Sequence, residues 1–377
     1  MPRPPEDSPS TNGPDTDRAV PTQVSSSKRA RTIVAYALTG LALAAVGVVV
    51  VRQRDAFADA LAAAAHAPVW LFALALLLPL INWWLVAISF WLMNARYAPT
   101  PLRENVALIA SAWLLNYLPM RPGMIGRVAY HKKRHGIPVS SSIRILFELT
   151  AMSGVAMLLM LVIALAVGHW APGVMQTSGA WAWWAVLFAP ALLFTVLGAA
   201  VRGLASGEVW SRWAWTAAVR YADVAVWAAR YAVVFALVGA PLGPREAVVV
   251  AIVSQIALLL PVTGNGLGVR EAAVGAVAGA MPAVGLWFGA DLGGGTGGSG
   301  AMEGAEEVVA AAEARAAVAV AADLVHRGLE VAVAVPVGLL GSAWLSRNIA
   351  RTPGAVLESS ADPESGLASE ERPSEAS

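Results

Sequence analysis

The chain contains no cysteine, and this absence excludes several kinds of chemistry at once. A protein without cysteine has no disulfide, no thiolate metal site and no cysteine nucleophile. The five histidines are too scattered along the sequence to form a metal site in place of cysteines. The sequence also has no Walker motif, no serine nucleophile elbow and no pair of acids on a recognisable catalytic scaffold. We therefore expect a protein that is not an enzyme, without catalytic residues, metal or cofactor.

Charged residues are scarce as well: they make up 14% of the 377 residues, whereas an ordinary soluble domain has about 25%. Hydrophobic residues make up 57% and occur in uninterrupted stretches of about 20, the length that crosses a bilayer as a helix. The formal net charge of +1 argues against a nucleic-acid partner, which would require an excess of clustered Lys and Arg. The composition predicts an all-α, polytopic integral membrane protein of the plasma membrane, without a large soluble domain.

A transmembrane domain over residues 33–346 is predicted between two polar tails. Residues 1–32 and 347–377 are polar and lack long apolar runs, so we expect both tails to be disordered. Tryptophans near the ends of the apolar stretches mark the level of the lipid headgroups. About six stretches are long enough for full spans, namely 33–51, 68–93, 145–168, 181–201, 214–240 and 317–346.

Two further apolar segments, 105–120 and 246–262, are too short for comfortable spans, and each runs into a stretch rich in Pro and Gly. Basic loops flank the first segment on both sides, so we expect it to enter and leave the membrane on one face, with the second re-entrant from the opposite face. The positive-inside rule places the basic loops and both termini in the cytoplasm. The basic loops are 94–104, 121–144, 202–212 and 347–351.

The two short segments continue in a similar way, which indicates an internal repeat. The first continues with Leu118-Pro119 and reaches Gly126-Arg127, and the second continues with Leu260-Pro261 and reaches Gly268, then Arg270. In both, a glycine stands at the same offset from the proline, and an arginine follows it. We interpret the two halves as an inverted repeat with two broken helices.

The first repeat covers about 33–168 and the second about 181–346, with a flexible Gly-rich insertion at 291–307 outside the membrane. Inverted repeats with broken helices are typical of secondary transporters, whose substrate sites lie where the repeats meet. At each break, Pro removes a backbone donor and Gly permits positive φ, so the helix is interrupted and leaves backbone N–H and C=O groups unpaired. At membrane depth such groups are stable only inside protein or beside a water-filled cavity. Such groups beside an arginine favour anion binding.

Charged residues also lie inside the predicted spans, where ionisable groups are costly and by default functional. Arg220, Asp223 and Arg230 share one face of the span 214–240, and we expect Asp223 to pair with one of the arginines.

The last span repeats the pattern with Asp323, Arg327 and Glu330, and His326 stands one step away. The alternative is that these residues are structural pairs that neutralise each other, such as Asp323 with Arg327. The residues that we predict to bind substrate are Asn116, Pro119, Gly123, Gly126, Arg127, Glu148, Pro261, Asn265, Gly266, Gly268, Arg270, Glu271, Asp323 and Arg327.

The second motif, from Leu260-Pro261 to Gly266-Leu267-Gly268-Val269-Arg270-Glu271, resembles a signature of the transmembrane region of lysylphosphatidylglycerol synthases, a flippase-like family of bacterial and archaeal membrane proteins. The resemblance covers about residues 33–346 and implies a lipid-linked envelope function in a stand-alone module that lacks the synthase domain. Departures include Leu149 after Glu148, where the family tends to have Arg, and a varied turn at 263–265. The other matching positions are Asn116, Leu118, Pro119, Gly123, Arg127, 132–134, Gly136, Ile137, Glu148 and 324–327.

The leading hypothesis is a translocase for an anionic phospholipid or lipid-linked glycan in envelope biogenesis, in which Arg127 and Arg270 bind the headgroup from opposite sides of the membrane. Its partners would be membrane lipids and, as a further candidate, an envelope-biosynthesis enzyme. One alternative is a non-catalytic scaffold or regulator of such an enzyme, and another is an integral transferase acting on a lipid carrier. His131 and His135 are expected in a solvated basic loop against anionic lipid, without a carboxylate nearby.

Overall fold

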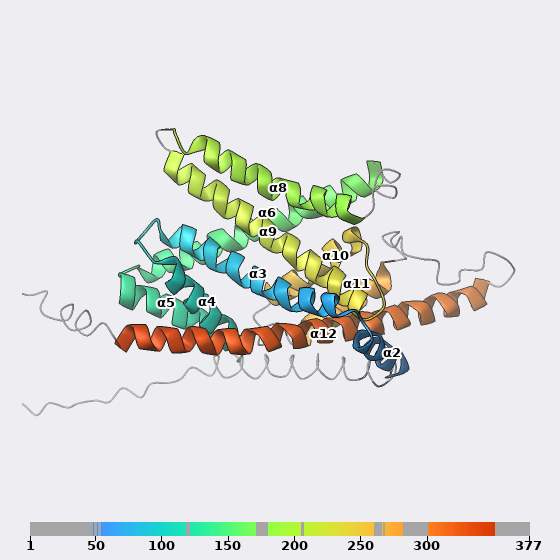
Figure 1. Cartoon of the computed structure of the whole chain (residues 1–377). Helices are drawn as coiled ribbons and strands as arrows, with labels where there is room; N and C mark the ends of the chain where they lie inside the picture. The colour runs from blue at the N-terminus through green and yellow to red at the C-terminus, as the bar shows by residue number, and fades with distance from the viewer. Residues whose placement is uncertain are drawn as a thin grey trace, which may run out of the picture.

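The computed structural model describes residues 48, 51, 54–117, 121–170, 180–204, 207–259, 266, 268–281 and 301–350. These residues form helices and no strand, which confirms the all-α class (Figure 1). The helices are α2 (Arg54–Ala65), α3 (Val69–Asn94), α4 (Leu102–Leu115), α5 (Pro122–His135), α6 (Val139–Trp170), α8 (Ala180–Val201), α9 (Gly207–Leu237), α10 (Pro244–Leu259), α11 (Val269–Ala280) and α12 (Ala301–Ala350).

Three helices in the described part of the chain, α3, α6 and α8, are long and apolar enough to cross a membrane. They coincide with three of the predicted spans. Large apolar side chains on these helices, such as Trp70, Phe147 and Leu193, are mostly exposed. Extensive exposed apolar surface is rare on proteins surrounded by water, so these surfaces suit contact with lipid.

The remaining predicted spans have different outcomes. Residues 214–240 and 317–346 lie mainly in α9 and α12, which are not among the three apolar helices. The span predicted at 33–51 lies outside the described residues except for Val48 and Val51. The full number of crossings and the inverted repeat therefore stay predictions.

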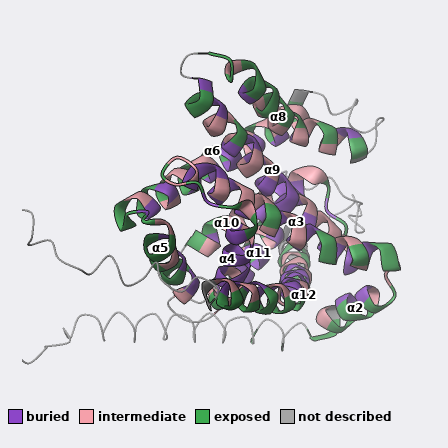
Figure 2. Ribbon diagram, turned by 60° about the vertical axis from the view of Figure 1, so that its left-hand side comes forward, coloured by how far each residue is buried: buried purple, intermediate pink, exposed green. Residues whose placement is uncertain are grey.

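The core of the bundle forms around α9, which contacts α3, α6, α8, α10 and α12. One face of α9 is completely buried and carries Tyr221, Ala225, Ala228 and Tyr231. Alanines on this face let neighbouring helices approach closely, and the two tyrosines fill the remaining space. Figure 2 shows buried residues where these helices meet and exposed residues along the outer sides of α8 and α12.

The long helix α12 joins the two halves of the described structure. Its 50 residues correspond to about 75 Å, and it runs along the lower edge of Figure 1. Glycines let two short helices, α11 and α4, pack closely against it. A Cβ on Gly275 of α11 would lie only 2.8 Å from Cγ2 of Val320 on α12. A Cβ on Gly341 of α12 would lie only 2.7 Å from the carbonyl oxygen of Ala107 on α4. Residues 301–307, which we expected in the Gly-rich insertion, belong to this helix.

The two segments predicted to be re-entrant contain short helices. The 14 residues of α4 and the 16 of α10 give lengths of about 21 and 24 Å, less than the roughly 30 Å of a hydrocarbon core. The basic segment 121–144 was expected to be a loop, but it contains α5 and the start of α6. Pro122 stands in the first turn of α5, and Gly136, with φ 66°, follows its last turn. Both residues favour a helix that begins at Pro122 and ends at His135.

Candidate functional site

The most distinctive feature inside the bundle is a buried network of ion pairs centred on Arg270 of α11, whose side chain is 0% exposed. Its Nε lies 3.0 Å from Oδ2 of Asp323, and its Nη1 lies 3.5 Å from Oε2 of Glu330. Its Nη2 lies 3.2 Å from Nδ1 of His326. The hydroxyl of Tyr231 donates to Oδ1 of Asp323 at 2.7 Å, so both carboxylate oxygens of Asp323 are bound.

Glu330 links this centre to α9 and α4. Its Oε2 lies 3.1 Å from Nη2 of Arg230, and its Oε1 accepts a hydrogen bond from Nε1 of Trp113 at 3.2 Å. Arg230 also lies over the ring of Trp227, with 4.1 Å between the guanidinium carbon and the ring centroid. One carboxylate therefore connects four helices in the bundle interior.

Asn82 of α3 carries the network from Arg230 to Arg220. Nη1 of Arg230 donates to Oδ1 of Asn82 at 3.2 Å, and Nδ2 of Asn82 donates to Oδ1 of Asp223 at 2.8 Å. Oδ2 of Asp223 lies 2.7 Å from Nη1 of Arg220, which confirms the predicted pairing of Asp223 with an arginine. Nε of Arg220 donates to Oγ of Ser153 on α6 at 2.9 Å.

The network balances its charges. Arg220, Arg230 and Arg270 contribute three positive charges, and Asp223, Asp323 and Glu330 contribute three negative charges. Burying an ion without a partner costs several kcal/mol, so such a network is stable in a low-dielectric interior only when charges and hydrogen bonds are matched.

The alternative pairing of Asp323 with Arg327 within one helix gives way to ion pairs with another helix. Asp323 pairs with Arg270, and Nε of Arg327 lies 2.7 Å from Oε1 of Glu271. Both partners come from α11, which packs along α12 and offers an opposite charge to each residue. Oε2 of Glu271 also accepts a hydrogen bond from the backbone N–H of Gly268 at 2.7 Å, which caps α11.

The second motif thus lies at the start of α11. Gly266 and Gly268 have φ values of 72° and 82°, which glycine adopts without the strain of a Cβ, and this fits a chain that turns sharply before the helix. Arg270 and Glu271 follow at once and bind Asp323 and Arg327. Pro261 and Asn265 lie outside the described residues.

The first motif lies at the start of α5. Gly123 packs so closely on the end of α4 that a Cβ would overlap the carbonyl oxygen of Ala112 and approach Oδ1 of Asn116, whereas Gly126 faces open space. Nη2 of Arg121 donates to the carbonyl oxygen of Leu258 at 2.6 Å. This bond brings the beginning of the first motif to the end of α10, just before the second motif. Pro119 lies outside the described residues.

Arg127, the arginine of the first motif, is 8% exposed and lies over the ring of Phe90, with 3.8 Å between the guanidinium carbon and the ring centroid. Burial lowers the pKa of Arg127 to about 10. No carboxylate pairs with Arg127 in the described part of the chain. The two motif arginines thus have different environments: Arg270 is enclosed by acidic partners, and Arg127 is not.

Glu148 pairs with two arginines that are not among the predicted site residues. Its Oε2 lies 2.6 Å from Nη1 of Arg96, and its Oε1 lies 2.9 Å from Nε of Arg144. Arg96 also faces the ring of Trp213, with 5.3 Å between the guanidinium carbon and the ring centroid. Glu148 thus links the loop after α3 to the first turns of α6.

The histidines of α5 lie in a buried polar cluster, not in a solvated loop. Nε2 of His135 lies 3.2 Å from Oε2 of Glu104, so the expectation that no carboxylate is near was also wrong. Tyr130 donates a hydrogen bond to the same carboxylate, and burial, followed by this bond, raises the pKa of Tyr130. Nδ2 of Asn94 lies 3.2 Å from Nε2 of His131, and burial, followed by the charge of Arg127, lowers the pKa of His131 to about 4.

This cluster was hard to predict from the sequence because Glu104 stands between two segments in which most charged residues are basic. The polar residues Asn94, Glu104 and Asn105 at the ends of apolar stretches were the available signal. Groups of three or more acidic or histidine residues arranged for a metal are absent from the described residues.

A pocket of about 170 Å³ opens beside the outer end of the ion-pair network, between α3, α6, α9 and α10. Arg220 and Ser153 lie in its wall with Gln255, and Leu259 at the end of α10 also lines it. Phe90, which carries Arg127 on its ring, belongs to the same wall. The pocket, which we call the Arg220 groove, therefore adjoins the network and both motif segments.

Comparisons with family models, with curated proteins and with solved structures find no match to this chain.

Proposed function

We propose that the protein is a membrane translocase for an anionic phospholipid or lipid-linked glycan, and that the headgroup passes through the Arg220 groove. The observation that carries the proposal is the position of Arg220. It ends a buried, charge-balanced network, its side chain is still 16% exposed, and it lines a groove that is otherwise mainly apolar.

The groove has the mixture of surfaces that a lipid requires. Arg220, Ser153 and Gln255 supply a cation and hydrogen-bonding groups for a phosphate, and Phe90, Leu146 and Met157 are among the apolar groups around them.

The outer face of α6 is exposed and apolar at Phe147, Val155 and Leu158. Acyl chains would remain against this face while the headgroup enters the groove.

Arg220 has an internal anion that a headgroup can replace. In the described structure its guanidinium binds Asp223, which Asn82 also holds through Oδ1. A phosphate in the groove would compete with Asp223 for Arg220. Asp223 would still keep its hydrogen bond to Asn82, so the exchange leaves no carboxylate without a partner.

Arg270 has a different role in this proposal from the one expected from the sequence. It is 0% exposed and bound to Asp323 and Glu330, so we assign it the positioning of α11 and α12 instead of direct headgroup binding. Arg127 keeps the headgroup-binding role, because it lacks a carboxylate partner in the described residues and lies on Phe90 in the groove wall.

The test uses full-length protein in liposomes that contain a fluorescent phosphatidylglycerol, with a membrane-impermeant quencher to measure lipid transfer between leaflets. Wild type should transfer the lipid, and Arg220→Gln should lower the rate by about tenfold or more, the effect of losing a charge-assisted hydrogen bond. Arg220→Lys should restore little, because an ammonium does not reproduce bidentate phosphate binding.

A second variant keeps the test independent of the ion-pair network. Gly154 lines the groove and Gly328 lies on α12, and a Cβ at either position meets open space. Gly154→Leu should fill the groove and slow transfer, whereas Gly328→Leu should not. Equal transfer rates for these two variants would exclude the groove as the path of the headgroup. Chemically altered lipid would instead indicate a transferase. A wild type that transfers no lipid would contradict the translocase and favour the scaffold function.

A further inference from the structure

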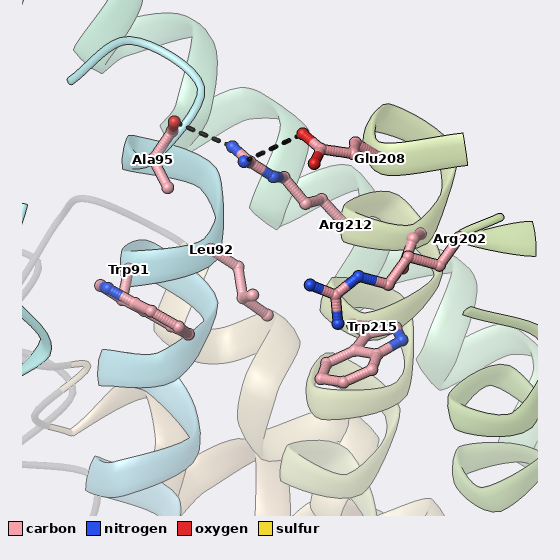
Figure 3. Close-up of a pocket in the computed structure, with 8 residues that line it drawn as sticks. Trp91, Leu92, Ala95, Arg202, Glu208, Arg212 and Trp215 are labelled. Atoms are coloured by element: carbon pink, nitrogen blue, oxygen red, sulfur yellow. Dashed lines mark hydrogen bonds and ion pairs between the residues drawn. The ribbon is translucent and has the colours of Figure 1, made fainter. Parts of the chain in front are cut away.

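A second pocket, separate from the Arg220 groove, lies between the last turns of α3 and the first turns of α9 (Figure 3). Its volume is about 260 Å³, and its wall combines Trp91, Trp215, Arg202 and Arg212. It shares no lining residue with the groove.

The two arginines of this pocket differ in how they are bound. Nη1 of Arg212 donates to the carbonyl oxygen of Ala95 at 2.9 Å, and its Nη2 lies 3.7 Å from Oε2 of the exposed Glu208. Arg202 is exposed, and Figure 3 shows its guanidinium reaching toward the pocket beside Trp215. The side chain of Arg202 makes no hydrogen bond or ion pair within the described residues. With one acidic and two basic side chains, the pocket has an excess of one positive charge.

The tryptophans give the pocket a fixed apolar side. The ring of Trp215 lies directly on Gly198 of α8, where any Cβ would overlap it, so the backbone of α8 sets the position of this ring. Trp91 forms the opposite part of the wall on α3. Indole rings are favoured at the headgroup level of a membrane, where one side is apolar and the other is wet.

A neighbouring hollow extends the basic surface. It shares Trp91, Ala95 and Arg212 with the pocket and adds Arg96 and Tyr97. Both hollows involve the segments 94–104 and 202–212, which the positive-inside rule assigns to the cytoplasmic side. Anionic lipids on that side attract basic residues near the membrane surface.

We infer that the pocket between α3 and α9 binds the phosphate headgroup of an anionic phospholipid, with Arg202 as the main ligand and Arg212 as the second. Its volume is slightly below the roughly 300–1,000 Å³ of pockets that enclose whole ligands, so it fits the headgroup while the acyl chains stay outside. Exposed apolar residues at Leu193 and Leu197 of α8 offer those chains a surface. This lipid site does not depend on translocation through the groove.

The site is tested by native mass spectrometry of the detergent-purified full chain mixed with phosphatidylglycerol or phosphatidylcholine. Wild type should retain more phosphatidylglycerol, and Arg202→Gln should weaken that binding by about tenfold, as expected for the loss of one charge-assisted hydrogen bond. Arg103→Gln is the matched control, because Arg103 is also exposed but does not line the pocket. Arg202 is exposed and unpaired within the described residues, so its replacement should not affect folding.

Further arms identify the ligand. Added to Gly154→Leu, in which the groove is filled, Arg202→Gln should still lower the remaining phosphatidylglycerol binding by about tenfold, which separates this site from the proposed function. Equal binding of the two lipids, or an equal effect of Arg202→Gln and Arg103→Gln, would overturn the assignment. Displacement of the lipid by millimolar inorganic phosphate in wild type, and not in Arg202→Gln, would identify a site for soluble phosphate and exclude a lipid site.

Discussion

The guanidinium of Arg270 on α11 lies 3.0 Å from the carboxylate of Asp323 on α12, and both side chains are 0% exposed. Two helices from different parts of the second half of the chain are therefore joined by a charge pair that water does not reach. Such a pair contributes little net stability when complete, but either charge alone is costly in the same place.

The first prediction follows from that asymmetry. Arg270→Met should lower the free energy of unfolding by about 3–5 kcal/mol, because Asp323 is left buried without a cation. The double variant Arg270→Met/Asp323→Leu should lose less than Arg270→Met alone. In the double variant the remaining charges of Arg220, Asp223, Arg230 and Glu330 still balance.

Thermal unfolding of the detergent-solubilised chain measures these changes. Asp55→Ala is the control, because Asp55 and its partner Arg54 are both more than 80% exposed, at 94% and 83%, and exposed pairs contribute little. The loss of stability in the double variant is compared with the sum of the losses in Arg270→Met and Asp323→Leu. If the two values are equal, the two residues are not coupled in the way that the structure indicates.

The second prediction concerns the contact between α11 and α12. Gly275→Leu should destabilise the protein by a few kcal/mol, because its Cβ alone would lie 2.8 Å from Val320 and the helices would have to separate. Gly328→Ala, at an exposed position of α12 with open space around it, should instead be neutral or stabilise by up to about 1 kcal/mol. Unfolding temperatures of the two variants compared with wild type check both signs.

The third prediction is a pH dependence at α5. Burial lowers the pKa of His131 to about 4 from an ordinary 6.5, so between these values the unfolded chain binds a proton that the folded chain excludes. The stabilisation that comes from keeping His131 neutral should be complete above pH 6.5. The free energy of unfolding should then fall as the pH is lowered toward 4, with a slope of up to about 1.4 kcal/mol per pH unit.

Nearby charges define the control for this measurement. Arg127 and His135 oppose a positive charge on His131, whereas Glu104, the acid of this cluster, is bound by Arg134, His135 and Tyr130. His131→Gln should flatten the stability profile between pH 4 and 6.5. His66→Gln, at an exposed histidine outside the cluster, should leave it unchanged. A profile that is unaffected by His131→Gln would assign the pH dependence to another group.

The sequence predicted what depends on spacing along a single helix and missed what depends on the choice of neighbouring helix. Asp223 and Arg220 pair as expected because three residues separate them on one face of α9. Asp323 and Arg327 are four residues apart and could have paired in the same way, but α11 offers each an oppositely charged partner. Hydropathy describes the composition of α11 and of α12, but not that these two helices pack together.

The buried cluster around Glu104 was missed for a similar reason. The excess of basic residues in 94–104 and 121–144 led us to expect that these segments, including the histidines of α5, would be exposed to solvent. The fold instead places the few polar and acidic side chains of these segments opposite the histidines of α5. Local composition sets the average environment of a segment, whereas tertiary contacts set the environment of each side chain.

The fourth prediction tests the re-entrant first segment, and the absence of cysteine makes it direct. Arg103 lies in the first turn of α4 and Ser140 in the first turn of α6, and both residues are exposed. If α4 does not cross the membrane, Arg103→Cys and Ser140→Cys should react with a membrane-impermeant maleimide from the same side in sealed vesicles. The length of α4, about 21 Å against a hydrocarbon core of roughly 30 Å, is the physical reason.

Ser178→Cys, in the segment 169–180 that lacks Lys and Arg, is the control and should react only from the other side. Inside-out and right-side-out vesicles from cells that express each variant provide the two exposures. Reaction of Arg103→Cys and Ser140→Cys from opposite sides would make α4 or α5 part of a full crossing. The basic residues of α5 would then not lie on the same side as those of 94–104, and the first half of the inverted repeat would fail.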